Sequence, residues 1–114
     1  MKIDKSLMSG STTLLILKLL DSSDMYGYQM ISELERRSES AFTLKAGTLY
    51  PILHNLEQQG MIESYEQAED SARPRKYYRI TKQGKQLFAE QKAQWTTYTS
   101  IVNQVLGGAN CAII

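Results

Sequence analysis

The sequence predicts a mainly α fold with a small β-hairpin, an arrangement of the α+β class. Three segments with helical spacing of apolar residues occupy the first sixty residues, and two short β-rich runs follow them. A last helical segment completes the pattern. The 114 residues suffice for one hydrophobic core, which usually takes about 100–150 residues. We therefore expect a domain over residues 1–80, a separate helix over 81–106 and a flexible tail over 107–114.

Two helices are predicted in the first forty residues. The first contains the apolar run from Leu14 to Leu20, ends near residues 22–24, and follows three hydroxyl residues, Ser11–Thr13. Such hydroxyls can cap the free N–H groups of a helix start. The second helix is expected from about Tyr26 to Arg37, because Met30, Ile31 and Leu34 form an apolar stripe opposite charged residues.

A third helix is predicted from four apolar residues at helical spacing, Leu49, Ile52, Leu53 and Leu56. Pro51 lacks an N–H, which a helix tolerates best in its first turn, so the helix is expected to begin around 45–48. Gly60 is the expected C-terminal stop, because glycine takes a left-handed conformation without penalty.

The next segment reads as a hairpin and a long helix. Residues 61–66 and 76–80 are β-rich runs, and the polar residues 67–75 between them predict a long loop. A fourth helix is predicted over 81–106, with Gly84 costing its first turn about 1 kcal/mol relative to alanine. Three helices followed by a hairpin predict a winged helix, with the second and third helices as the helix-turn-helix and the hairpin as the wing.

The net charge argues against binding to polyanions by bulk attraction, because 13 basic residues stand against 12 acidic ones, a total of +1. The charges are nevertheless separated along the chain. Residues 73–85 carry six basic and no acidic residues, whereas 57–70 carry five acidic and no basic ones. The basic cluster is what a phosphate-contacting wing requires. It is also compatible with a solvated edge strand that lysine and arginine protect from aggregation.

Several classes of protein are excluded by what the sequence contains. The single Cys111 and the single His54 cannot form an internal disulfide or a Cys- or His-based metal centre, so no metal or cofactor is expected. A glycine-rich phosphate loop and a catalytic Ser/His/Asp or Cys/His set are missing, which argues against an enzyme. The longest apolar run is residues 14–17, and the first 13 residues do not resemble a signal peptide, so we expect a cytoplasmic protein that does not bind membranes.

The third helix carries polar or small residues away from its apolar stripe, as a helix inserted in a DNA major groove would. These residues are Lys45, Ala46, Thr48, Tyr50, Pro51, His54, Asn55 and Gln58. Asn55 and Gln58 have the amide groups that pair with adenine edges, and Lys45 can reach guanine or phosphate. A plain surface helix would have a similar composition, and that alternative stays open.

The fourth helix carries an apolar seam at heptad spacing. Its two series are Phe88, Trp95 and Val102, and Gln91, Tyr98 and Val105. A helix of 25 residues reaches about 37 Å, which is longer than a small three-helix body, so we expect much of the seam to pack on a second copy of the chain. The alternative is that the helix folds back on its own domain. Trp95 is then either core filler or one wall of an aromatic pocket.

The sequence resembles the PadR-like transcriptional regulators in three stretches: YGYQM (Tyr26–Met30), GTLYPILHNLEQQGMI (Gly47–Ile62) and RPRKYYRITKQGK (Arg73–Lys85). The resemblance implies a homodimeric winged-helix repressor whose third helix enters the major groove and which a small effector releases from DNA. With one terminal helix, the chain is similar to the small members of the family. Some of those regulate multidrug efflux and stack flat aromatic compounds on a tryptophan of the terminal helix, where Trp95 lies here.

On this basis we expect three groups of site residues and a double-stranded operator with an inverted repeat. The DNA-binding group is Tyr26, Gly27, Gln29, Lys45, Ala46, Thr48, Tyr50, Pro51, His54, Asn55, Arg73, Arg75 and Lys76. The effector group is Phe88, Trp95 and Tyr98. The dimer group is Leu87, Phe88, Gln91, Trp95, Tyr98, Val102 and Val105. The alternative function is a winged-helix adaptor that binds proteins and no DNA.

Overall fold

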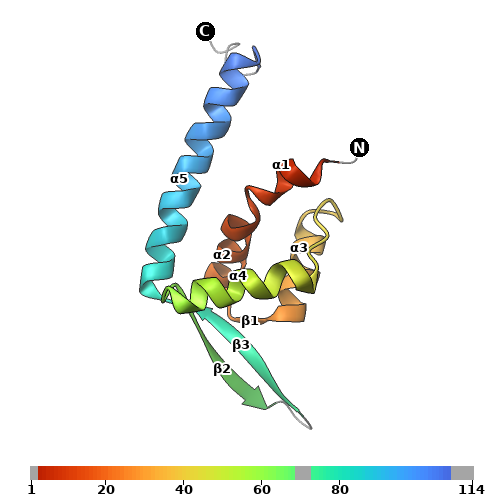
Figure 1. Ribbon diagram of the computed structural model, residues 1–114, viewed down its shortest axis with the longest axis vertical. Helices are drawn as coiled ribbons and strands as arrows, with labels where there is room; N and C mark the ends of the chain where they lie inside the picture. Colours follow the sequence, from red (N-terminus) through yellow and green to blue (C-terminus); the bar gives the residue numbers. More distant parts are fainter. Residues whose placement is uncertain (1–2, 69–72, 109–114) are drawn as a thin grey trace.

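The computed structural model describes residues 3–68 and 73–108, so Cys111 and most of the predicted tail lie outside the described residues. In chain order the elements are α1 (Lys5–Ser9), α2 (Thr12–Ser22), β1 (Met25–Tyr26), α3 (Gly27–Arg37), α4 (Ala46–Gln58), β2 (Ile62–Ala68), β3 (Pro74–Ile80) and α5 (Lys82–Val105). Figure 1 shows α1 to α4 packed with a short sheet, a hairpin projecting from one side and the long α5 from the other. The predicted winged helix with a C-terminal helix is confirmed.

The core lies between α2, α3, α4 and the inner face of the sheet. Ile16, Leu17, Met30 and Leu49 are inaccessible to solvent, and the remaining buried side chains are also almost entirely apolar. The predicted stripe of α4 packs as expected, with Leu49, Leu53 and Leu56 buried and Ile52 half-buried. Burial of this stripe fixes the rotation of α4, because the polar side of an amphipathic helix must then face solvent.

The wing is longer than the sequence predicts, and the sheet has a third strand. Strands β2 and β3 pair antiparallel from Ile62↔Ile80 to Ala68↔Pro74, so Gln67 and Arg75 lie opposite each other in the ladder and not in a loop. The predicted loop over residues 67–75 was too long at both ends, because polar side chains on both faces of an exposed hairpin show no alternation of polar and apolar residues. The two residues of β1 pair with the other edge of β3, which gives the order β1-β3-β2. A strand this short has no detectable period.

The start of the chain also differs from the prediction. Helix α1 precedes α2, which begins at Thr12. The hydroxyls of Ser11 and Thr12 donate to the carbonyl oxygen of Met8, at 3.1 and 3.4 Å. They therefore satisfy the C-terminal end of α1, and Ser11, the N-cap residue of α2, makes no side-chain capping hydrogen bond. A prediction that treats hydroxyl runs as N-caps cannot anticipate a preceding helix of five residues.

The first turn of α5 is firmly attached to the domain. The Thr81 hydroxyl lies 2.7 Å from the Gly60 carbonyl oxygen and accepts from the N–H of Gly84 at 3.0 Å. A Cβ at Gly84 would lie 2.0 Å from the carbonyl oxygen of Met61, so glycine is required where the helix passes over the chain. The expectation that Gly84 weakens this turn was wrong, because the residue permits a close approach that periodicity does not reveal.

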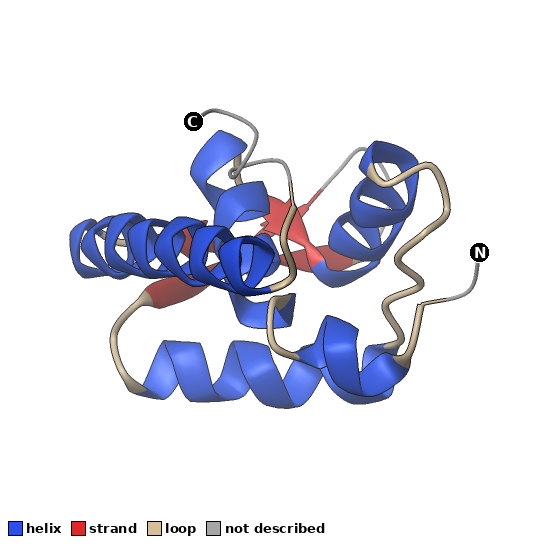
Figure 2. Cartoon of the chain, turned by 90° about the horizontal axis from the view of Figure 1, so that it is seen from above, coloured by secondary structure: helices blue, strands red, loops and turns tan. Residues whose placement is uncertain are grey.

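Helix α5 then leaves the domain and gives the molecule a longest extent of 58 Å. The wing extends from the side of the domain opposite to the far end of α5. In a view from the α5 side, the helices therefore cover much of the sheet (Figure 2). The wing tip and the free part of α5 are therefore at opposite ends of the molecule, and α4 lies between them (Figure 1).

Candidate nucleic-acid interface

The exposed face of α4 presents the side chains that the sequence predicts for a recognition helix. Each of Lys45, Ala46, Gly47, Thr48, Tyr50, Pro51, His54, Asn55 and Gln58 is exposed. Pro51 has no N–H to donate to the carbonyl of Gly47, so that exposed oxygen keeps its acceptor capacity. The first turn contains no acidic side chain that would repel phosphate.

Two residues mark opposite flanks of this exposed face. At 3.6 residues per turn, Thr48 and Tyr50 point about 160° apart around the axis of α4. Tyr50 points towards the start of α3, where its hydroxyl rests against Gly27. A Cβ on Gly27 would lie 2.2 Å from that hydroxyl oxygen. Gly27 thus lets Tyr50 sit at the junction of α3, α4 and the sheet.

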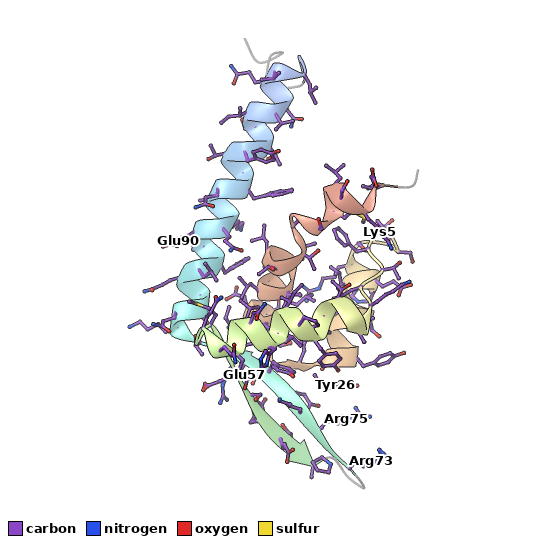
Figure 3. All side chains as sticks on the ribbon, in the orientation of Figure 1. Lys5, Tyr26, Glu57, Arg73, Arg75 and Glu90 are labelled. Carbon is purple, nitrogen blue, oxygen red and sulfur yellow. The ribbon has the colours of Figure 1, made fainter. Side chains whose placement is uncertain are left out.

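A basic hollow of about 460 Å³ lies on the Tyr50 flank, and we call it the wing-side hollow. Its lining comes from β1, α3, α4 and β3: Tyr26, Gly27, Tyr28, Tyr50, Arg75, Lys76 and Tyr78. The lining contains two cations and no acidic residue, which suits a phosphate group. Figure 3 shows Tyr26 and Arg75 on this side of α4, with Arg73 farther out along the wing.

Aromatic rings hold the cations of the wing-side hollow in place. The Arg75 guanidinium lies 4.5 Å from the centre of the Tyr26 ring, and the Lys76 ammonium lies 5.5 Å from the centre of the Tyr78 ring. A cation over an aromatic face is attracted by the ring quadrupole. Burial raises the pKa of Tyr78, so this ring stays neutral beside Lys76.

The outer face of the sheet carries a row of three tyrosine rings. Tyr77 makes an edge contact with Tyr26 at 5.4 Å between centroids and stacks on Tyr65 at 5.7 Å. The Tyr65 hydroxyl donates to the Asp24 carboxylate at 2.7 Å, and this bond raises the pKa of Tyr65. The row therefore joins β2, β3 and the segment before α3, and it fixes the base of the wing.

The structure brings most of the predicted DNA-binding residues to one surface formed by α4, the start of α3 and β3. Arg73 stands apart, towards the wing tip. Gln29 is half-buried, and its Oε1 atom is buried without a hydrogen-bond partner among the described residues. Sequence reasoning missed Tyr28 and Tyr78 of the wing-side hollow. Tyr28 lies inside the YGYQM stretch, which was the available signal.

The predicted effector residues separate into two environments. Trp95 and Tyr98 lie together, with ring centroids 6.2 Å apart. They help line a hollow of about 490 Å³ with Gly10, Thr13 and Leu14 from the α1–α2 junction and with Gln91 and Gln94. Phe88 lies nearer the start of α5, where it packs with Leu87 against the domain core.

The dimer residues show the same division along α5. Leu87, Phe88 and Gln91 are half-buried within one chain. Beyond them, Tyr98 is 60% and Val105 81% exposed, whereas Trp95 is 37% exposed and Val102 is half-buried. The far half of the seam thus presents apolar surface that its own domain does not cover.

Residues 3–68 and 73–108 contain no group of three or more His, Cys, Asp or Glu side chains arranged to hold a metal ion. None of the helices in these ranges has the length and apolar character needed to cross a bilayer.

Solved structures similar to this one include transcriptional regulators. A transcriptional regulator from Clostridium thermocellum superposes with a TM-score of 0.82 at 29% identity, covering 90% of this chain and 96% of that one. A PadR family regulator from Clostridium difficile gives 0.72 at 35% identity, covering 84% and 98%. An uncharacterised Lysinibacillus sphaericus protein is 31% identical over 93% of this chain and 97% of its own length.

The family described as "Transcriptional regulator PadR-like family" matches residues 16–90, a span that contains α3, α4, the wing and the start of α5. This span includes the wing-side hollow and the whole exposed face of α4. Accordingly, the chain belongs to the PadR-like family of transcriptional regulators.

Proposed function

We propose that the protein is a homodimeric repressor that binds an inverted-repeat operator, with α4 in the major groove and the wing along the backbone. The observation that carries this proposal is the continuous surface of α4 and the wing-side hollow. Uncharged polar side chains suited to base edges occupy the exposed face of α4, and Arg75 and Lys76 lie beside it. This division matches the general one, in which phosphate contacts position a protein and base contacts specify the sequence.

The far half of α5 supports a dimer. Tyr98, Ile101 and Val105 are each more than half exposed on a helix of 24 residues. An apolar stripe of this length on a soluble protein calls for a partner surface. A two-fold dimer would place its two α4 helices about 34 Å apart, one turn of DNA, and would therefore prefer an inverted repeat.

Release of DNA by an effector is the last part of the proposal. The hollow beside Trp95 and Tyr98 opens next to the exposed half of α5, so a planar aromatic or cationic molecule would lie between the two protomers. Stacking and cation–π attraction contribute about 1 kcal/mol each in such sites. Trp95 is the only tryptophan, so its fluorescence reports binding directly. Titration of a folded dimer with planar dyes should quench this fluorescence. If none of the dyes quenches it, Trp95 does not bind an effector and serves only in packing.

The DNA-binding part is tested by comparing Asn55→Ala with Arg75→Ala. The probe is a duplex selected from a random-sequence pool by the unmodified protein. Loss of Asn55 should lower discrimination at one base position by about 1–3 kcal/mol and leave the salt dependence unchanged. Loss of Arg75 should weaken binding to all sequences and reduce the salt slope by about one for each lost contact. Unchanged affinity of Arg75→Ala at physiological salt would refute the role of the wing.

A further inference from the structure

A second hollow lies on the opposite flank of α4, and we call it the α1-side hollow. It has a volume of about 210 Å³ and is formed by α1, the start of α2, the segment before α4 and the first turn of α4. Its polar lining consists of Lys5, Ser9, Thr12, Thr43, Lys45 and Thr48. No acidic residue is in the lining. Asp4 precedes α1 but does not line the hollow.

The two lysines are the charged donors of the α1-side hollow. The Ser9 hydroxyl already donates to the carbonyl oxygen of Ser6, and the Thr12 hydroxyl donates to that of Met8. Lys5 and Lys45 are exposed, and neither forms an ion pair within the described part of the chain. Two unpaired ammonium groups beside an otherwise uncharged hollow favour an anion as its occupant.

The position of the α1-side hollow on the flank of α4 indicates that this anion is a phosphate of the DNA backbone. Thr48 lines the α1-side hollow and Tyr50 lines the wing-side hollow, on opposite flanks of the same helix. Figure 3 shows Lys5 on one side of α4 and Arg73 and Arg75 on the other. A helix about 10–12 Å across fills a major groove about 12 Å wide, so its flanks face the phosphates of the two opposite strands.

We propose that Lys5, together with Lys45, binds a backbone phosphate on the edge of the major groove opposite the wing. Short helix α1 is then a third DNA-contacting element, and α4 is held in the groove from both sides. The proposal rests on the proposed DNA-binding function. It adds a contact that lies outside the helix-turn-helix and the wing.

The test measures DNA affinity as a function of salt for the full-length protein and for Lys5→Ala, with the selected duplex as the probe. Each phosphate contact contributes about 0.9 to the slope of log K against log salt, so losing two copies in a dimer should lower it by about 1.8. The same relation predicts about fivefold weaker binding at 0.15 M salt for each lost contact. Lys5→Arg keeps the charge and should keep the slope.

Lys18→Ala is the matched control, because Lys18 is an exposed helical lysine that lines neither hollow. It should bind with the slope of the unmodified protein. Phosphate ethylation interference supplies a second readout: the unmodified protein should show contacts on both edges of the groove, and Lys5→Ala should show weaker interference on the edge opposite the wing.

The outcomes separate this proposal from the one that it rests on. An unchanged slope for Lys5→Ala, with a reduced slope for Arg75→Ala, would overturn the role of Lys5 and leave the function intact. Failure of the unmodified protein to select any duplex would overturn both. Equal losses for Lys5→Ala and Lys18→Ala would show a general charge effect and would also overturn the site.

Discussion

Single residues decide how closely the elements of this domain approach one another. Gly84 lets α5 cross the carbonyl of Met61, and Gly27 lets the Tyr50 hydroxyl reach the junction of α3 and α4. Neither role is visible in the sequence, where a glycine inside a helical pattern indicates only lost propensity. Helix propensity describes an isolated helix. Glycine is required at these two positions because a segment more than twenty residues away in the chain passes close to the backbone.

The first prediction contrasts two helical glycines. Gly84→Ala should destabilise the protein by about 1–3 kcal/mol, because its new methyl group overlaps the Met61 carbonyl. Gly47→Ala should stabilise it by up to about 1 kcal/mol, since Gly47 lies in α4 with no atom within 4 Å of an added Cβ. Urea unfolding followed by circular dichroism measures both. Equal effects of the two substitutions would contradict the close approach at Gly84.

The second prediction concerns pH and Glu33. Hydrogen bonds from Arg36 and then Arg37 lower the pKa of Glu33 from 4.5 to about 2. A lowered pKa means that the stabilisation is present above the unfolded-state value and is lost as the pH falls towards 2. Glu33→Gln should therefore be slightly less stable than the unmodified protein at pH 7. The difference should shrink between about pH 4.5 and 2.

Denaturant unfolding across this pH range measures the difference. Because the Glu33 side chain and the Arg36 guanidinium are solvent-accessible, solvent screening keeps the effect small, and low ionic strength is needed to resolve it. A difference that stays constant from pH 7 to pH 2 would contradict the ion pairs as its source.

At the scale of elements, sequence reasoning was most successful where burial imposes a period. The starts and ends of α3 and α4 were predicted within one or two residues, because a 3.6-residue stripe faces the core. It failed for α1, for β1 and for the outer part of the wing. These segments are short or exposed, so their sequences do not show the periodic spacing of apolar residues that burial of one face imposes. Helix α1 matters most here, because missing it also concealed Lys5 as a candidate contact.

The third prediction concerns the row of tyrosines that holds the wing. Tyr65→Phe removes the hydrogen bond to Asp24 and keeps the ring that stacks on Tyr77, so the melting temperature should fall modestly. Tyr77→Leu removes the contacts with both neighbouring rings and should lower it further. Thermal melts compare the two variants. A larger effect of Tyr65→Phe would mean that the hydroxyl, and not the stack, fixes the wing.

At the scale of the whole molecule, the near-neutral net charge of +1 combines regions with different roles. Arg75 and Lys76 lie on one flank of α4, and Lys5 and Lys45 on the other. A low total limits non-specific attraction to DNA, so in the proposed dimer the sequence preference would come from α4 and from the spacing of the two subunits. The sequence predicted the basic wing. The second basic flank could be recognised only from the structure, because Lys5 and Lys45 are far apart in the sequence.

The fourth prediction tests the subunit contact. Ile101→Lys places a charge on the exposed apolar half of α5, where Ile101 is 54% exposed, and should shift the protein towards a monomer. Thr96→Lys adds the same charge to an exposed position about 140° around α5 from Ile101 and is the control. Sedimentation velocity measures the mass of each. A monomer for the unmodified protein, or a dimer for Ile101→Lys, would contradict the proposed interface.

In the proposed function, two copies of this chain read DNA together through α4. Selection from a random duplex pool, followed by footprinting of the selected sequences, tests it most directly. We expect an inverted repeat whose half-sites are centred about 10 base pairs apart, with protection on both. Selected sequences with a single unrepeated site would contradict the dimeric reading, and a pool that shows no enrichment would contradict sequence-specific DNA binding itself.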